Sequence, residues 1–183
     1  MSIRTKTDTA HYEAFLARPE NSDRRFELID GEIVEKMPTQ LHAYIIQMLS
    51  GFLFVYLRQN PIGYALIEAR YRPPNTTDND LIPDLSFISK GHGALVQSGP
   101  ALYLPDLAVE AQSDGQSDQF MLAKAQRYLN SGSRLVWLIY STQQRIEVIT
   151  PADRQLLTIN DRLDGGAVLP NFSIRVGDLF PTE

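Results

Sequence analysis

The sequence predicts an α/β (α+β) fold in which helices flank a mixed β-sheet, and two observations carry this prediction. Leu135–Tyr140 is continuously apolar, as expected for a strand that is covered on both faces. Before it come a strand-like run, Asp106–Gln112, and then a helical segment with Ser117 as its N-cap. Strand, helix and buried strand in this order form a βαβ crossover with two parallel strands.

The composition is that of a soluble globular protein. The chain has 183 residues, of which 43% are hydrophobic and 21% charged, so we expect one domain over residues 1–183 with residues 1–10 as a loose N-terminus. No apolar run approaches the roughly 20 residues of a membrane helix, and no apolar signal core follows the charged N-terminus. We therefore expect a cytoplasmic protein that does not act at a membrane. The absence of cysteine excludes disulfides, thiolate zinc sites and a cysteine nucleophile.

The net charge of −5 argues against tight DNA binding by the free monomer. Affinity for nucleic acid comes largely from Lys and Arg side chains that neutralise phosphates, and these normally leave a basic surface. Only a local basic surface would reverse this argument. Arg70 and Arg72 near a strand end, with Lys124 and Arg127 on a helix, are the candidates for it.

The N-terminal part of the chain predicts a short helix and a hairpin. His11–Arg18 forms an amphipathic helix, and the strands Arg25–Ile29 and Glu32–Lys36 flank Asp30-Gly31, a strong signal for a type I′ turn. Within the first strand, period two places Glu27 on the same face as an apolar residue. A solvated charge on an edge strand is the more frequent explanation of such a glutamate.

A long helix follows, with Thr39 as its N-cap and its end near Gln59, where Asn60-Pro61 stops it. His42 falls in its first turn, and a surface or packing role is expected for it because no second histidine lies nearby. The helix after Ser117 is expected to end at Asn130-Ser131-Gly132. The other predicted strands are Gly63–Arg72, Leu81–Ile88, Arg145–Thr150, Gln155–Ile159 and Phe172–Val176.

Three charged residues occupy positions that are costly beside a core. Asp84 opens the run Pro83–Ile88, and Glu110 closes the strand that begins at Asp106. If these two strands pair antiparallel, the start of one lies beside the end of the other, so the two carboxylates meet. Period two places Gln112 on the face of Glu110. Two close carboxylates repel unless a cation lies between them, and oxygen ligands of this kind suit Mg²⁺ or Mn²⁺.

Lys124 lies on the apolar side of the helix that follows Glu110. With about 100° of rotation per residue, it falls between Phe120 and Met121, on the side expected to face the sheet. Its ammonium would then reach the negative charges of Asp84 and Glu110. A structural ion pair, or a lysine stem that packs while its charge reaches solvent, is the alternative.

Five segments, in the right order, carry a resemblance to a known family. They are Arg25–Val34, which is similar to an opening "YELIDGE", Ile82–Leu85, Pro105–Glu110, Lys124–Leu129 and Val136–Ile139. Over Tyr12 to Phe180 the chain resembles the Uma-two family of restriction endonucleases, which belongs to the PD-(D/E)XK nuclease superfamily.

The resemblance implies a restriction-endonuclease-like core and a Mg²⁺-dependent (or Mn²⁺-dependent) endonuclease that hydrolyses DNA as a homodimer. Asp84 and Glu110 would be catalytic residues and metal ligands, with the carbonyl of Ala111 beside them. The usual E-x-K lysine is absent because Glu110-Ala111-Gln112 ends in glutamine, so Lys124 would replace it from the next helix. Glu27 would add a supporting carboxylate. Ser113–Gln116 departs from the commoner Ser-Pro-Ser of the family.

The main alternative is a nuclease-fold protein that binds or regulates without cutting. The acidic charge and the altered segment ending in Gln112 favour it. Other enzyme classes are disfavoured, because the chain has no Gly-x-Gly-x-x-Gly, Walker or Gly-x-Ser-x-Gly motif. The scattered histidines His11, His42 and His92 suit neither a zinc site nor a serine triad.

Overall fold

A six-stranded mixed sheet forms the centre of the computed structural model, which describes residues 6–181. The strand order is β3-β4-β5-β6-β7-β8, and every neighbouring pair is antiparallel except β5 and β6, which are parallel and joined through helix α3. The predicted crossover and the mixed sheet are therefore confirmed. The sheet strands are β3 (Gly63–Ile67), β4 (Leu85–Ser89), β5 (Leu107–Ala111), β6 (Leu135–Tyr140), β7 (Arg145–Ile149) and β8 (Arg154–Thr158).

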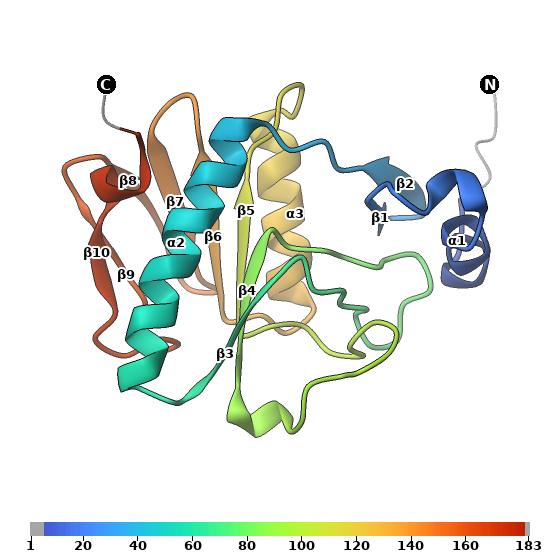
Figure 1. Ribbon diagram of the computed structural model, residues 1–183, viewed down its shortest axis with the longest axis horizontal. Coiled ribbons are helices and arrows are strands. Elements are labelled where there is room, and N and C mark those ends of the chain that lie inside the picture. Colours follow the sequence, from blue (N-terminus) through green and yellow to red (C-terminus); the bar gives the residue numbers. More distant parts are fainter. Residues whose placement is uncertain (1–5, 182–183) are drawn as a thin grey trace.

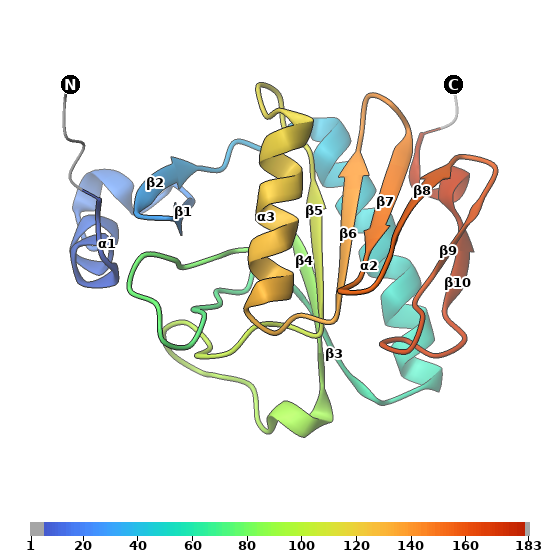
Figure 2. The same cartoon turned by 180° about the vertical axis from the view of Figure 1, so that it is seen from behind.

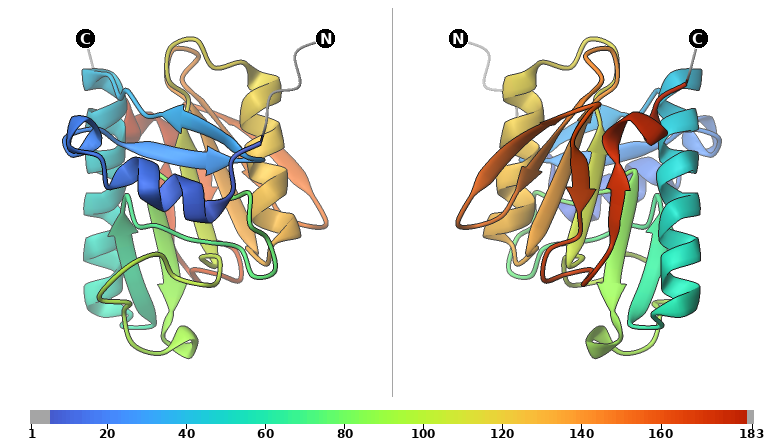
Figure 3. Two further views of the ribbon diagram at one scale, coloured as in Figure 1. Left: turned by 90° about the vertical axis from the view of Figure 1, so that its right-hand side faces the viewer. Right: turned by 90° about the vertical axis from the view of Figure 1, so that its left-hand side faces the viewer.

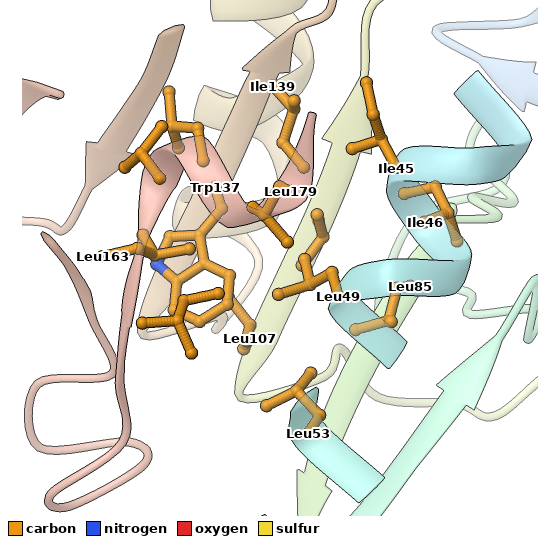
Figure 4. Packing of buried hydrophobic residues seen from close by; sticks show 14 of the residues in the cluster. Ile45, Ile46, Leu49, Leu53, Leu85, Leu107, Trp137, Ile139, Leu163 and Leu179 are labelled. Carbon is orange, nitrogen blue, oxygen red and sulfur yellow. The ribbon is translucent and has the colours of Figure 1, made fainter. Parts of the chain in front are cut away.

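One long helix covers each face of this sheet: α2 (Gln40–Gln59) on one side and α3 (Asp118–Asn130) on the other (Figures 1 and 2). Side chains alternate along β6, so that Trp137 belongs to the core beneath α2, whereas Leu138 belongs to the core beneath α3. Figure 4 shows Leu49 and Leu53 of α2 pointing toward the sheet in the first of these cores. Both faces of β6 are buried, as its continuous apolar run predicts.

The N-terminal segments form a separate hairpin beside the sheet. Helix α1 (Thr9–Leu16) precedes β1 (Phe26–Ile29) and β2 (Glu32–Glu35), which pair antiparallel and lie across one side of the molecule between α2 and α3 (Figure 3, left). Asp30 and Gly31 both have positive φ, 48° and 79°, which confirms the predicted type I′ turn. The remaining elements are η1 (Pro19–Asn21), η2 (Lys90–His92), β9 (Arg162–Asp164), β10 (Ser173–Arg175) and η3 (Val176–Leu179).

Two expectations about strand limits were wrong, and one strand was not predicted. The strand expected over Gly63–Arg72 ends at Ile67, because Glu68 takes a φ of +51° that is incompatible with an extended strand. The strand expected over Leu81–Ile88 begins only at Leu85, so Asp84 immediately precedes it. Strand β9 was not predicted.

Residues 1–10 were predicted to be a loose terminus, but the described part of this segment is hydrogen-bonded and includes the start of α1. Residues 1–5 lie outside the described part. Thr7 N–H donates to the Gly31 carbonyl at 2.9 Å, and Thr9 N–H donates to the Thr77 carbonyl at 2.7 Å. Asp8 caps α1 through the backbone N–H of His11. These bonds tie the start of α1 to the hairpin turn at Gly31 and to the loop at Thr77.

Helix α2 is long and apolar enough to cross a membrane by length and composition, contrary to the expectation that no segment of the chain is. It also has the pattern of a core helix, because Ile45, Leu49 and Leu53 are fully buried against the sheet. A single helix of this kind is weak support for a membrane span. The opposite side of α2 leaves Phe54 and Val55 exposed.

Two glycines provide a test of the packing around β3. A Cβ at Gly63 would overlap the carbonyl oxygen of Ile88 and would lie 2.6 Å from the ring of Phe87, whereas a Cβ at Gly51 on the exposed side of α2 would meet nothing within 4 Å. We expect Gly63→Ala to lower the free energy of unfolding by about 1–3 kcal/mol through overpacking. Gly51→Ala should raise it by about 0.5–1 kcal/mol because alanine is the better helix former. Urea unfolding measures both, and equal effects of the two substitutions would contradict this packing.

Candidate functional site

A cavity of about 630 Å³ opens where the hairpin, β4, β5 and the two long helices meet. Its charged lining combines carboxylates and lysines from separate elements. Glu27 comes from β1, Asp84 from the residue before β4, and Glu110 from β5. Lys36 follows β2 and Lys124 lies in α3. All of these side chains are largely buried, which makes their pairing the central question of the site.

Lys124 connects two of the carboxylates. Its Nζ lies 2.7 Å from Glu27 Oε2 and 2.8 Å from Glu110 Oε2, and its side chain is 2% exposed. Glu27 Oε1 also accepts the backbone N–H of Ile82 at 2.7 Å. Glu110 Oε1 accepts the hydroxyl of Tyr128 at 2.6 Å, one helical turn after Lys124. Each of the four carboxylate oxygens thus has a donor, as buried charges require.

Asp84 is held by different partners. Lys36 Nζ donates to Asp84 Oδ1 at 2.6 Å and to the carbonyl of Ile82 at 2.6 Å. The backbone N–H of Ala111 donates to Asp84 Oδ2 at 2.8 Å, and His42 Nε2 lies 3.4 Å from the same oxygen. The bond from Ala111 crosses from β5 to the start of β4. This is the contact between the two strands that their antiparallel pairing predicts, with Leu85 opposite Val109.

The burial of the site shifts the pKa values of its groups in opposite directions. Burial alone would raise the pKa of Asp84, but Lys36, His42 and Lys124 hold it well below its usual value. Burial raises the pKa of Glu110 to about 7, although Lys124 beside it acts in the other direction. Burial would lower the pKa of Lys124, yet Glu110 and Glu27 raise it above its usual value. Two carboxylates on neighbouring strands therefore differ strongly in acidity, a pattern typical of functional sites.

The expected meeting of Lys124 with the carboxylates is found, with one difference in its partners. Lys124 pairs with Glu110, as expected from its helical angle, but its second partner is Glu27 instead of Asp84. The interpretation of Glu27 as a solvated edge-strand charge is wrong, because this residue is 2% exposed. Its strand docks against the sheet and is buried along its whole length.

Gln112 does not join the carboxylates. Its amide Nε2 donates to the Gln116 carbonyl at 2.9 Å and to Asp118 Oδ1 at 3.0 Å, and it does not line the cavity. Strand β5 ends at Ala111, so period two no longer applies to the next residue. Gln112 instead holds together the loop from Ser113 to Gln116 at the rim of the cavity.

The expected basic surface is not free. Arg70 and Arg72 both pair with the buried Asp80 and with Glu13, and Arg127 pairs with Asp30. The fourth member, Lys124, is the buried lysine of the site. These cations stabilise the hairpin and its surroundings, so they are not available together for phosphates.

Lys36 and His42 were not predicted to belong to the site. His42 was assigned a surface or packing role, yet it is buried at 5% exposure beside Asp84. Helical spacing could have found it, because it lies three, four and seven residues before the buried Ile45, Ile46 and Leu49. Lys36 follows the end of a short strand, where no periodicity indicates the direction of a side chain.

The comparisons with known proteins agree with the resemblance. A family model named Uma2, described as "Putative restriction endonuclease", matches residues 12–177. The chain belongs to the Uma2 family. A solved structure titled as a putative nuclease belonging to DUF820, from Anabaena variabilis, is similar with a TM-score of 0.77 and 22% identity, over 92% of this chain and 96% of the other. The Uma2 protein thus has the restriction-endonuclease-like fold that was predicted. A search among curated proteins finds no match.

The family implies a divalent metal, and the residue types of the cavity fit one. Among residues 6–181 no group of three or more His, Asp and Glu side chains is arranged to bind a metal. Mg²⁺, however, is usually held by one or two carboxylates and several waters. Asp84 and Glu110 come from adjacent strands and line one cavity large enough for such waters. This donor set suits Mg²⁺ or Mn²⁺ and does not suit metals that prefer sulfur or several histidines.

The raised pKa of Glu110 predicts a pH dependence of stability. The folded protein holds this proton up to about pH 7, and the unfolded chain only up to the usual 4.5. The stabilising contribution of protonated Glu110 is therefore complete below about pH 4.5 and is lost as pH rises through 7. We expect the free energy of unfolding of wild type to fall by about 1–3 kcal/mol relative to Glu110→Gln between pH 5 and 8. Urea unfolding in EDTA measures this difference. A difference that does not change with pH would contradict a raised pKa.

Proposed function

We propose that this protein is a Mg²⁺- or Mn²⁺-dependent endodeoxyribonuclease that hydrolyses DNA phosphodiester bonds. One observation carries the proposal: Asp84 and Glu110 line the same cavity from neighbouring antiparallel strands, and the Lys124 ammonium from the following helix lies 2.8 Å from Glu110. Membership of a family described as restriction endonucleases supports the reaction class. The proposal treats the whole chain as one nuclease domain.

In the proposed mechanism, Asp84 and Glu110 would hold the metal ion, with the carbonyl of Ala111 as a further oxygen. A bound Mg²⁺ would lower the pKa of a water molecule and neutralise charge that develops on the phosphate. The Ala111 N–H fixes the orientation of Asp84 through its 2.8 Å bond. Tyr128 does the same for Glu110.

Lys124 would position the attacking water or offset negative charge in the transition state. Its ammonium is fixed between two carboxylates, so it needs no reorganisation during the reaction. Glu27 would act through Lys124 as a positioning residue. Because the E-x-K position holds Gln112, whose amide holds the adjoining loop, Lys124 is our candidate for the lysine of this nuclease site.

DNA as substrate, a cytoplasmic location and a homodimer are part of the same proposal. A single site of this kind cuts one strand, so a double-strand cut requires two copies, and two-fold dimers are the commonest oligomers. The pairing of Arg70, Arg72 and Arg127 with carboxylates argues for weak DNA binding by one copy. A second copy would double the contacts with the duplex.

The alternative, a nuclease-fold protein that binds or regulates without cutting, is favoured by one observation. Every carboxylate oxygen of Glu27, Asp84 and Glu110 already has an N–H or O–H donor of the protein within hydrogen-bonding distance. Such a set could serve stability alone. The two functions differ in whether purified protein cuts DNA when metal is added.

Nicking of supercoiled plasmid tests the proposal. We expect wild type to cut with Mg²⁺ or Mn²⁺ and to stop with EDTA. Asp84→Asn, Glu110→Gln and Lys124→Met should each lower the rate by about 100-fold or more, because each removes a metal ligand or a preorganised charge. Glu20→Gln, a substitution of an exposed carboxylate in η1, serves as the matched control and should cut at the wild-type rate.

Two outcomes would refute the nuclease function. One is the absence of metal-dependent nicking by folded wild type, and binding of DNA under those conditions would then favour the alternative. The other is nicking that survives in both Asp84→Asn and Lys124→Met, since this would identify a contaminating nuclease.

A further inference from the structure

Lys36 is a second buried cation of the cavity, and the proposed reaction does not use it. Its ammonium bonds to Asp84 Oδ1 and to the carbonyl of Ile82, both at 2.6 Å. Its side chain is 10% exposed. Asp84 is one of the two carboxylates that would hold the metal. The Lys36 ammonium therefore occupies an oxygen that a divalent cation would need.

The charges of the cavity show why Lys36 and a metal oppose each other. With their carboxylates ionised, Glu27, Asp84 and Glu110 carry three negative charges, and Lys36 and Lys124 carry two positive charges. The five side chains together therefore have a net charge of −1. A divalent cation added to these five buried side chains would give the set one net positive charge. If the Lys36 ammonium leaves, the same cation makes the set neutral. Glu35 and Asp114 also line the cavity but lie nearer solvent. Uncompensated buried charge is costly, so the neutral arrangement is favoured.

Lys36 is less enclosed than Lys124, with 10% of its side chain exposed against 2%. The backbone N–H of Lys36 is fixed by the Arg25 carbonyl at 2.9 Å, but its ammonium lies at the end of four rotatable bonds. The next residue, Met37, is 72% exposed, so the segment that carries Lys36 borders solvent. Lys124 is 2% exposed in the middle of α3 and is bonded to two carboxylates.

Asp84 would stay in place after this exchange. Its Oδ2 keeps the bond from the Ala111 N–H, which belongs to β5 and does not depend on Lys36. The oxygen that becomes free is Oδ1, the one that accepts from Lys36, and both Asp84 and Glu110 line the cavity. The site is thus preorganised for a cation even while a lysine fills it.

We infer that Lys36 is a built-in competitor of the metal, whose ammonium occupies Asp84 in the metal-free protein and moves into solvent when Mg²⁺ or Mn²⁺ binds. This inference rests on the proposed function, because it takes Asp84 as a metal ligand. Lys36 is a positioning residue in this scheme and not a catalytic one. Its consequence is a lowered metal affinity, so that the site fills only when divalent metal is abundant.

Mn²⁺ binding to the whole protein, followed by the electron paramagnetic resonance signal of free Mn²⁺, tests the inference. We expect Lys36→Met to bind Mn²⁺ at least about tenfold more tightly than wild type, because a unit charge a few ångströms away is removed. Lys36→Arg keeps the charge and should stay close to wild type. Lys90→Met removes an exposed lysine just beyond the far end of β4 and should change the affinity less than about twofold, because solvent screens a distant charge.

The outcomes separate this inference from the nuclease function. An affinity of Lys36→Met equal to or weaker than that of wild type overturns the competitor role, even if wild type cuts DNA with Mn²⁺. Tighter binding by Lys36→Met supports the competitor role, even if no variant cuts DNA. If neither wild type nor Lys36→Met binds Mn²⁺, both proposals are wrong.

A second measurement uses wild type alone, in case Lys36→Met does not fold. Acetylation of lysines is followed by mass spectrometry with and without saturating Mg²⁺. We expect the modification of Lys36 to rise several-fold with Mg²⁺, because its ammonium moves into solvent, while Lys124 stays protected in both states. No increase at Lys36 in protein that binds Mg²⁺ would overturn the displacement.

Discussion

The buried ammonium of Lys124 is the interaction on which the arrangement of this protein depends. It lies between Glu27 of the hairpin and Glu110 of the central sheet, and it comes from the helix that connects β5 to β6. One side chain thus joins three parts of the chain. Removing one member of such a buried set typically costs about 3–5 kcal/mol, because the other charges lose their compensation. The position of the hairpin therefore depends on a charge at this cavity and not on apolar packing alone.

The central βαβ unit could be predicted from the sequence because its signals are local and agree with one another. A continuous apolar run identified β6, Ser117 capped α3, and the angle of Lys124 along that helix placed it toward the sheet. The hydrogen bond from Ala111 to Asp84 fits the predicted antiparallel contact. Where the expectations failed, tertiary structure decided. Glu68 ends β3 through its backbone conformation, which the residue type does not indicate.

The candidate site could be predicted only in part for the same reason. Glu110 and Lys124 lie on elements whose periodicity gives the direction of the side chain, and Asp84 immediately precedes the strand β4. Glu27 lies in the four-residue strand β1, and Lys36 is the residue after the four-residue strand β2. The burial of both side chains therefore depends on how the hairpin packs against the rest of the protein. The period-two pattern predicts which residues of a strand share a face, but it does not predict whether both faces of the strand are covered by other elements. In β1, Phe26 and Leu28 pack against α1, whereas Ile29 packs in the core that includes α3.

The two lysines of the cavity illustrate how stability and chemistry compete in one place. Three carboxylates lie together in a core only where cations or protons compensate their charge, and in the metal-free chain Lys36 and Lys124 supply cations. Each lysine that stabilises the fold also occupies oxygens that a metal would use. Lys124 is enclosed and is paired with two carboxylates from separate elements, so we expect it to stay when a metal binds. Lys36 sits beside an exposed residue and holds one oxygen of Asp84. The depth at which each ammonium lies therefore separates a permanent part of the site from an exchangeable one.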